Sequence, residues 1–133
     1  MTMTRPLDIL LVEDEAITVM ALRIELRQAG FNVLRSVATG EDAVGSLEDA
    51  VPDVILMDMR LAGRLTGMDT AVLIREKHPI PIVFMTGYPD AALLEKAKRM
   101  DSVGYVVKPV SASSIKAAVE GVLGSGPDSK STG

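Results

Sequence analysis

LDILLVEDE, residues 7–15, runs from an almost continuously apolar segment directly into three carboxylates. Between Leu7 and Val12 only Asp8 interrupts the apolar residues, which is typical of a strand buried on both faces of a parallel sheet. Three neighbouring negative charges repel one another. The rest of the chain must therefore supply a feature that makes this crowding tolerable.

The residues after these acids change to a helical period. The apolar residues that repeat at this spacing are Ile17, Met20, Ala21 and Ile24. Gly30 follows where the C-terminus of a helix favours glycine. A helix over residues 15–29 is therefore predicted directly after the first strand.

The alternation of apolar strands and periodic helices continues along the chain. Further strands are predicted at residues 32–37, 53–58, 80–87 and 103–107. Further helices, with Thr39, Pro89 and Ser111 at the starts of three of them, are predicted at residues 40–50, 68–78, 90–100 and 111–123. Five strands alternating with five helices predict an α/β fold, in which helices cover both faces of a parallel sheet and the crossovers are right-handed.

Composition excludes several classes of protein. The 133 residues carry 14 Lys and Arg against 18 Asp and Glu, a net charge of -4 with no basic run, which is unlike a nucleic-acid binder. The absence of cysteine excludes disulfides and thiolate metal sites. No apolar run is long enough for a signal core or a membrane span. We expect a cytoplasmic protein of one domain, with neither nucleic acid nor membrane as a partner.

The two ends of the chain carry little that a core would bury. Residues 1–5 are expected to form a loose start, and the polar, Gly- and Ser-rich residues 124–133 a disordered tail. The folded domain is therefore predicted to span residues 6–123.

Polar side chains stand at the carboxyl ends of the predicted strands. They are Glu13 and Asp14 after the first strand, Asp58 at the third, Thr86 at the fourth and Lys108 after the fifth. Ligands bind at this edge of open α/β sheets, so these side chains are expected to converge there. One such residue is most often a turn or cap residue, but five at one edge predict a site.

The clustered acids need a cation or a proton. Two carboxylates a few Å apart repel by about 4 kcal/mol at an effective dielectric constant of about 20. Oxygen ligands of high charge suit Mg²⁺ better than zinc, because Mg²⁺ is commonly held by one or two carboxylates with phosphate oxygens and water. A divalent metal would thus explain the acids after the first strand. Glu15 is the exception, a residue at a helix N-terminus that the helix dipole favours.

Four motifs in this order resemble the receiver domain of two-component response regulators. They are LLVED (residues 10–14), VILMD (54–58), VFMTG (83–87) and GYVVKP (104–109). The resemblance covers about residues 6–123 and implies a five-stranded, flavodoxin-like (βα)5 fold. It also implies a phosphorylated signalling protein that catalyses only its own phosphorylation and dephosphorylation, rather than an enzyme.

The resemblance implies a role for each acid. Asp58 would accept a phosphoryl group from a histidine kinase or a histidine phosphotransfer protein, in a reaction that depends on Mg²⁺. Glu13 and Asp14 would position the metal, with Asp58 and the backbone carbonyl of Arg60 as its other protein ligands. A carboxylate nucleophile that forms an acyl phosphate suits this chemistry.

The resemblance also covers the ends of the last two strands. Thr86 and Lys108 would bind phosphoryl oxygens, and the Lys108–Pro109 peptide bond would be cis. Thr86 and Tyr105 would form the switch that reports phosphorylation, although Tyr105 could instead simply pack on an edge strand.

Two stretches depart from the pattern of the family. The segment DMRLAGRLTG, residues 58–67, lacks the usual proline and is one residue longer, which leaves the path of the loop open. FMTGY, residues 84–88, resembles the Phe-Ala-Thr-Gly-Tyr signature of a stand-alone receiver subgroup, with Met85 in place of alanine. That subgroup is associated with kinases of the HWE and related types, so the resemblance implies such a kinase as a partner.

Two large residues are candidates for controlling the lifetime of the phosphoryl group. Arg60 and Tyr88 stand two residues after Asp58 and Thr86, where they would flank the path of a hydrolytic water. Neither is a carboxylate or an amide, so slow dephosphorylation is predicted. The alternative for Tyr88 is that it packs on the loop.

Two other functions remain open. One is a degenerate receiver that binds partners without phosphorylation. The other is a Mg²⁺-dependent phosphatase with an aspartate nucleophile, but that class needs a second Asp at the position of Arg60. The sequence shows no output domain, so the signal is expected to leave through contact with a downstream protein, as an effector, a shuttle or a phosphate sink.

Overall fold

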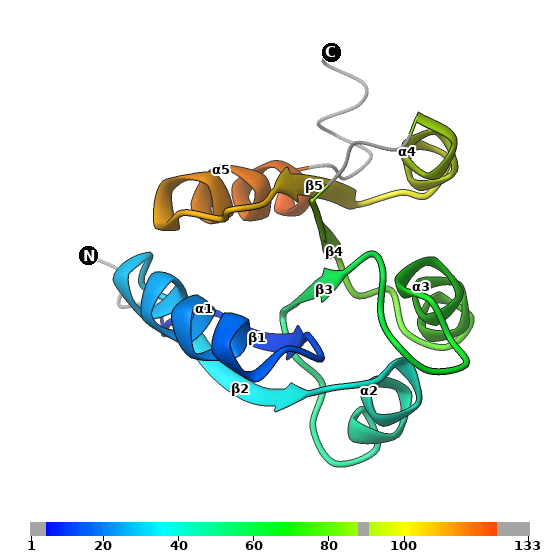
Figure 1. Cartoon of the computed structure of the whole chain (residues 1–133), viewed down its shortest axis with the longest axis horizontal. Helices are drawn as coiled ribbons and strands as arrows, with labels where there is room; N and C mark the ends of the chain where they lie inside the picture. Colours follow the sequence, from blue (N-terminus) through cyan, green and yellow to red (C-terminus); the bar gives the residue numbers. More distant parts are fainter. Residues whose placement is uncertain (1–4, 88–90, 125–133) are drawn as a thin grey trace.

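The computed structural model describes residues 5–87 and 91–124, in which strands and helices alternate as predicted (Figure 1). The strands are β1 (Asp8–Val12), β2 (Asn32–Val37), β3 (Val54–Asp58), β4 (Ile82–Thr86) and β5 (Val103–Val107). The helices are α1 (Ala16–Gln28), α2 (Gly40–Ser46), α3 (Gly67–Arg75), α4 (Ala91–Lys98) and α5 (Ala112–Leu123). The predicted start of the fourth helix at Pro89 lies outside the described residues, as do residues 1–4 and 125–133 of the two predicted loose ends.

All five strands form one parallel sheet in the order β2-β1-β3-β4-β5. Helices α1 and α5 cover one face, and α2, α3 and α4 cover the other (Figure 1). The predicted α/β fold is confirmed. The direction in which the chain adds strands reverses between β1 and β3, so their carboxyl ends flank the crevice where sheets of this kind bind ligands.

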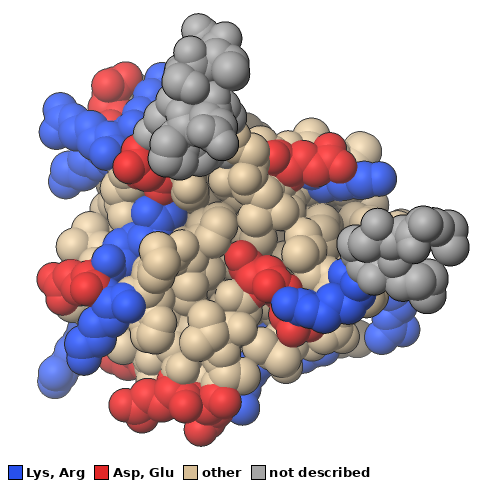
Figure 2. Space-filling model, turned by 180° about the vertical axis from the view of Figure 1, so that it is seen from behind, with Lys and Arg blue, Asp and Glu red and all other residues tan. Residues whose placement is uncertain are grey.

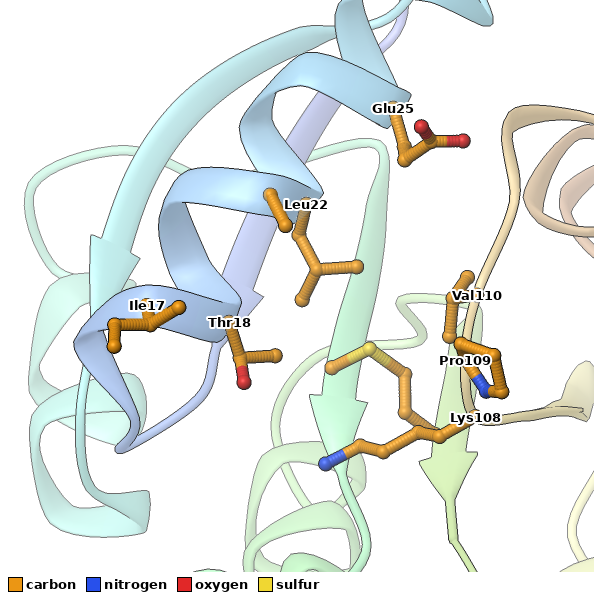
Figure 3. A pocket seen from close by; sticks show the side chains of 9 residues that line it. Ile17, Thr18, Leu22, Glu25, Lys108, Pro109 and Val110 are labelled. Carbon is orange, nitrogen blue, oxygen red and sulfur yellow. The ribbon is translucent and has the colours of Figure 1, made fainter.

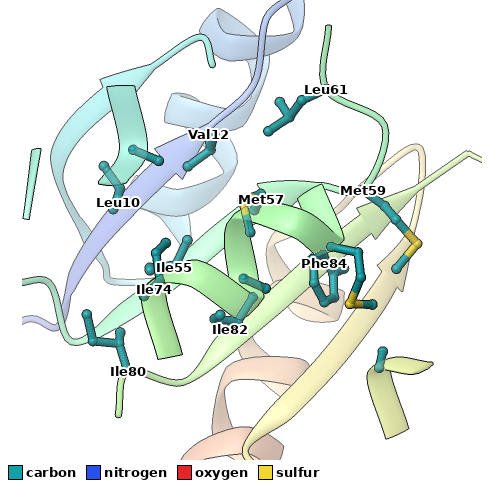
Figure 4. Packing of buried hydrophobic residues seen from close by; sticks show 14 of the residues in the cluster. Leu10, Val12, Ile55, Met57, Met59, Leu61, Ile74, Ile80, Ile82 and Phe84 are labelled. Carbon is teal, nitrogen blue, oxygen red and sulfur yellow. The ribbon is translucent and has the colours of Figure 1, made fainter. Parts of the chain in front are cut away.

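Two apolar cores fill the space between the sheet and its helices. Side chains alternate along each strand, so Leu10, Ile55 and Phe84 face α2, α3 and α4 (Figure 4), whereas Ile9 and Leu56 face α1 and α5. The three central strands are buried on both faces, which explains their continuous apolar runs. These strands give the site at their carboxyl ends a rigid base.

The two edge strands are less buried. Strand β2 leaves Asn32, Leu34 and Arg35 exposed, in agreement with its weaker apolar pattern. At the opposite edge, Tyr105 and Val107 of β5 are both 45% exposed.

Helix α1 is confirmed, but its apolar repeat does not face the core. The buried residues are Leu22 and Leu26, whereas Ile17, Met20 and Ile24 are 79%, 67% and 58% exposed. The helix has apolar residues on two sides, and periodicity alone does not tell which side meets the sheet. The exposed side is an apolar stripe on the surface.

Local signals set the ends of several helices. The hydroxyl oxygen of Thr39 accepts a hydrogen bond from the Asp42 N–H at 3.1 Å, and that of Ser111 accepts one from the Ser114 N–H at 3.1 Å. These are the predicted N-caps of α2 and α5. Gly30 has φ +91°, a left-handed conformation that glycine adopts easily after a helix.

The amino ends of β1 and β3 are joined by an ion pair. The Asp53 carboxylate accepts two hydrogen bonds from the Arg5 guanidinium, at 2.9 and 3.0 Å, and a third from the Asp8 N–H at 2.7 Å. The hydrogen bonds from Arg5 lower the pKa of Asp53, and this effect is larger than the opposing effect of burial. The pKa of Asp53 is therefore below its usual value.

Charges of both signs share the surface. On the face seen in Figure 2, groups of basic and acidic residues alternate with uncharged ones. Within residues 5–87 and 91–124, no helix is both long and apolar enough to cross a membrane.

Candidate metal and phosphoryl-acceptor site

Three of the predicted site residues meet at the carboxyl ends of β1 and β3. Glu13 and Asp14 follow β1, and Asp58 is the last residue of β3. Each offers a carboxylate oxygen, and these oxygens lie within 4.8 Å of one another. The cluster predicted from the strand ends is therefore present in the fold.

Backbone N–H groups fix one oxygen of each carboxylate. Glu13 Oε2 accepts a hydrogen bond from the Glu15 N–H at 3.1 Å, and Asp58 Oδ1 accepts one from the Arg60 N–H at 3.0 Å. Both donors stand two residues after their acceptors, so the turns that leave the strands orient these side chains. Glu13 and Asp58 are also buried, with only 3% and 7% of their surface exposed.

Asp14 differs from the other two acids because it is exposed. Its Oδ2 accepts a hydrogen bond at 3.1 Å from the N–H of Ala62, which lies in the loop between β3 and α3. In the described part of the chain, this is the single hydrogen bond found for the Asp14 side chain. Its other oxygen is therefore the most open of the cluster to a ligand from solvent.

Lys108 supplies the positive charge of the site. Its Nζ donates to Glu13 Oε1 at 3.1 Å and to Asp58 Oδ2 at 3.2 Å. The Lys108–Pro109 peptide bond is cis, as the resemblance implied. Burial opposes the charge of Lys108, but its hydrogen bonds to the two carboxylates outweigh burial, and the pKa of Lys108 is raised. The ammonium therefore partly neutralises the acids without a metal.

The carboxyl of Glu13 has a shifted pKa. Burial raises the pKa of its carboxyl above the usual value, and the hydrogen bonds from Lys108 and Glu15 only partly oppose this effect. The ionised form of Glu13 is thus less stable here than in water. A cation bound beside it would favour that form.

The remaining predicted residues lie at the same edge or close to it. Thr86 ends β4 and is buried, and its carbonyl oxygen accepts a hydrogen bond from the Lys108 N–H at 2.8 Å. Tyr105 lies on the edge strand β5 with its side chain half exposed. Arg60 follows Asp58 by two residues and is exposed, whereas Tyr88 lies outside the described residues.

The donor set fits Mg²⁺. The three clustered acids offer only oxygen ligands, and the arrangement leaves Asp14 open to solvent. Zinc is usually held by Cys or His with oxygen ligands in the minority, and neither residue type belongs to this cluster.

The structure also shows a pocket that the sequence did not reveal. It has a volume of about 470 Å³ and lies between α1 and the segment from Lys108 to Val110. Leu22 and Pro109 face each other across it, and the Lys108 side chain runs along one end (Figure 3). The exposed apolar stripe of α1 begins at the rim of this pocket, at Ile17.

Comparison with known proteins agrees with this geometry. The response regulator receiver domain matches residues 9–120. The chain is 35% identical over 115 residues to the transcriptional regulatory protein PdtaR of Mycobacterium tuberculosis, a match that covers 86% of this chain and 56% of that protein. It is 34% identical over 114 residues to the regulatory protein LuxO of Vibrio vulnificus, covering 85% of this chain and 25% of that protein. The chain thus spans about half the length, or less, of these relatives.

Solved structures match over nearly the whole chain. The signal receiver domain of a modulated diguanylate cyclase from Desulfovibrio desulfuricans superposes with a TM-score of 0.80 at 33% identity, covering 96% of this chain and 99% of that one. The receiver domain of PhyR from Erythrobacter litoralis gives a TM-score of 0.74 at 26% identity, covering 89% and 90%. The fold, the position of the acids and the match of residues 9–120 agree, and the chain belongs to the receiver domain family of two-component response regulators.

Proposed function

We propose that this chain accepts a phosphoryl group on Asp58 in a Mg²⁺-dependent reaction, with a histidine kinase or a histidine phosphotransfer protein as the donor. The observation that carries the proposal is the meeting of Asp58 with Glu13, Asp14 and Lys108 at one end of the sheet. Membership of the receiver family supports it.

The proposed reaction uses few groups of the protein. A carboxylate oxygen of Asp58 attacks the phosphorus, the bond from phosphorus to the donor's imidazole nitrogen breaks, and its electron pair stays on that nitrogen. An acyl phosphate forms on Asp58. The hydroxyl of Thr86 and the ammonium of Lys108 bind the transferred oxygens and offset their charge.

The acids would hold the metal. Glu13, Asp14 and Asp58, with the backbone carbonyl of Arg60, are the proposed protein ligands. Bound Mg²⁺ supplies positive charge to the phosphoryl oxygens. Once Asp58 is phosphorylated, Lys108 is free to leave its carboxylate and follow the new charge, while Thr86 and Tyr105 report the change as the switch pair.

The donor protein is proposed to dock on the α1 side of the molecule. Ile17 and Met20 offer apolar surface there, and the pocket beside them reaches Lys108. A helical donor of the HWE kinase type, as the FMTGY motif suggests, could bury this surface while its phosphohistidine reaches Asp58. The signal would then pass to a downstream protein in the cytoplasm, with this chain as effector, shuttle or phosphate sink.

Phosphorylation with a small donor tests the proposal. Incubation with acetyl phosphate and Mg²⁺ should add one phosphoryl group, detected by intact mass, and chelator or Asp58→Asn should prevent the addition. A folded protein that binds Mg²⁺ but never gains the group would favour the degenerate receiver. Continuous release of phosphate from many substrate molecules would instead favour the phosphatase.

A further inference from the structure

One hydrogen bond of the acidic cluster comes from a distant part of the chain. Glu13 and Asp58 are oriented by N–H groups two residues away, but Asp14 is oriented by Ala62, which is 48 residues away. The loop of residues 59–66 between β3 and α3 therefore contacts Asp14, which follows β1. This loop is also one of the two segments where the sequence departs from the family pattern.

Asp14 depends on this contact for its orientation. Its side chain is exposed, and no other hydrogen bond to it is found within residues 5–87 and 91–124. An exposed carboxylate without a partner samples several rotamers, and a ligand that needs one of them must bear the entropy of fixing it. Glu13, which is buried and bonded to Lys108, has no such freedom.

The loop is well anchored on both sides of Ala62. Met59 and Leu61 are buried in the core, and the Met59 N–H continues the sheet by donating to the Met85 carbonyl at 2.9 Å. At the far end, the Gly67 N–H donates to the Met59 carbonyl at 3.1 Å. A side chain at Gly67 would collide with the Asp58 carbonyl oxygen, so glycine lets α3 begin this close to the site.

We propose that the backbone N–H of Ala62 is a positioning group for Mg²⁺, which holds the Asp14 carboxylate in the orientation that the cation needs. The inference deepens the proposed function and rests on its metal site. An N–H bonded to one carboxylate oxygen leaves the other oxygen for the ligand. The loop of residues 59–66 thus contributes to metal affinity through its backbone rather than through a side chain.

Thermodynamic linkage makes the proposal testable from two directions. If the Ala62 hydrogen bond favours Mg²⁺ binding, then Mg²⁺ must favour the hydrogen bond by the same factor. An exposed hydrogen bond contributes less than a buried bond to an ionised group, because water competes for it, and corresponds to a factor of about 3 to 10 in an equilibrium constant. The loss of Mg²⁺ affinity without the hydrogen bond and the slowing of Ala62 amide exchange by Mg²⁺ should therefore give the same factor.

The first experiment removes the donor. Ala62→Pro has no N–H at this position, whereas the matched control Ala62→Gly keeps the donor and also loses the methyl group. We expect Ala62→Pro to weaken Mg²⁺ binding, measured by calorimetry, by about 3- to 10-fold relative to Ala62→Gly. Circular dichroism of the metal-free proteins checks that both are folded. Equal affinities in two folded variants would overturn the proposal.

The second experiment needs no substitution at Ala62. Hydrogen exchange of the Ala62 amide, followed by NMR in the wild-type protein, should slow by about 3- to 10-fold when Mg²⁺ is saturating. Unchanged or faster exchange would show that the metal does not use this bond or competes for it, and would overturn the proposal even if Ala62→Pro does not fold.

The two levels of the hypothesis fail in different ways. If wild-type protein shows no Mg²⁺ binding in the calorimeter, the proposed metal site itself is wrong. If wild-type protein binds Mg²⁺ and the Ala62 results are negative, the metal site stands and only the role of the loop is rejected.

Discussion

Lys108 and the proposed metal ion would compete for the carboxylates of Glu13 and Asp58. The ammonium binds Glu13 Oε1 and Asp58 Oδ2, and both carboxylates belong to the acidic cluster proposed to bind the metal. Lys108 therefore stabilises the metal-free protein and at the same time opposes the cation. Its two effects have opposite signs and can be measured separately.

We expect Lys108→Met to lower the free energy of unfolding without metal by about 2 kcal/mol, because two buried carboxylates lose a charged hydrogen-bond partner. The same change should tighten Mg²⁺ binding several-fold, since no ammonium has to be displaced. Denaturant melts in chelator and calorimetric titrations give the two numbers. Lys108→Arg, which keeps the charge, is the control, and weaker Mg²⁺ binding by Lys108→Met would contradict the idea of competition.

From their places in the sequence, two residues after Asp58 and Thr86, we propose that Arg60 and Tyr88 set how long a phosphoryl group on Asp58 survives. Neither side chain is a carboxylate or an amide, the groups best suited to orient a hydrolytic water. We expect Tyr88→Ala, and more weakly Arg60→Asn, to speed the loss of phosphate from Asp58 by a few-fold without abolishing phosphorylation. The decay of the phosphorylated protein is followed by intact mass. Unchanged or slower decay in both variants would show that these side chains do not exclude water.

At the level of elements, Arg75 ties three segments together at the end opposite the site. Its Nε donates to the Ile80 carbonyl at 2.7 Å and its Nη2 to the Ser102 carbonyl at 2.9 Å. The guanidinium thus joins the C-terminus of α3 to the start of β4 and to the turn before β5. Ser102 has a left-handed backbone, with φ 55°, so this turn benefits from an external support.

We expect Arg75→Met to lower the free energy of unfolding by about 1.5 kcal/mol, because the Ile80 carbonyl loses its partner in a partly buried site. Arg75→Lys should lie between wild type and Arg75→Met, since one ammonium does not span both carbonyls as the guanidinium does. Denaturant melts provide the measurement. Phosphorylation of Asp58 should be unaffected. An Arg75→Met variant that unfolds like wild type would show that Arg75 does not contribute to stability.

What the sequence predicted and what it missed follow from the kind of signal each element carries. The central strands, the N-caps Thr39 and Ser111 and the polar strand ends were predictable, because apolar runs and capping residues are local patterns. The contact of Ala62 with Asp14 was not, because every residue has the same backbone donor and only the tertiary path of the loop selects one.

The same reasoning explains two further differences. Arg75 bonds to carbonyl oxygens, which leave no trace in the sequence. Helix α1 has two apolar sides, and only docking on the sheet decided that Leu22 and Leu26 would be the buried ones.

At the scale of the whole molecule, the pKa values of acids at the two ends of the sheet are shifted in opposite directions. At the amino end, Arg5 keeps the pKa of Asp53 below its usual value. At the carboxyl end, burial keeps the pKa of Glu13 above its usual value. The surroundings therefore favour the negative charge of Asp53 at the amino end and disfavour that of Glu13 at the carboxyl end, where the cation is proposed to bind.

The sign of each pKa shift predicts a pH dependence of stability. The raised pKa of Glu13 means that its neutral carboxyl contributes to the free energy of unfolding in full below the unfolded pKa of about 4.3. This contribution is lost as pH rises through the raised pKa of the folded state. In chelator, Glu13→Gln should therefore match wild type at about pH 4 and become the more stable protein as pH rises towards 8. Saturating Mg²⁺ should reverse this order, because it binds the wild type more tightly.

Asp53→Asn is the counterpart with the opposite sign. The ionised Asp53 contributes to the free energy of unfolding in full above its unfolded pKa of about 3.9. This contribution is lost as pH falls through the lowered pKa of the folded state. The variant should therefore be less stable than wild type at neutral pH. The difference in stability should become smaller in acid and should not depend on Mg²⁺. Thermal melts from pH 3 to 8 test both variants, and parallel pH profiles for wild type and either variant would contradict the assignment for that residue.

The apolar stripe of α1 has a consequence for how many upstream signals this protein can collect. Contacts to Ile17 and Ile24 are non-directional, and Met20 between them is flexible enough to pack against differently shaped surfaces. Such a surface gives affinity without much discrimination, since discrimination needs a repulsive element against the wrong partner. If the proposed donors dock on this stripe, we expect several of them to phosphorylate the same chain, so that its phosphorylation level would report the sum of their activities rather than the state of any one of them.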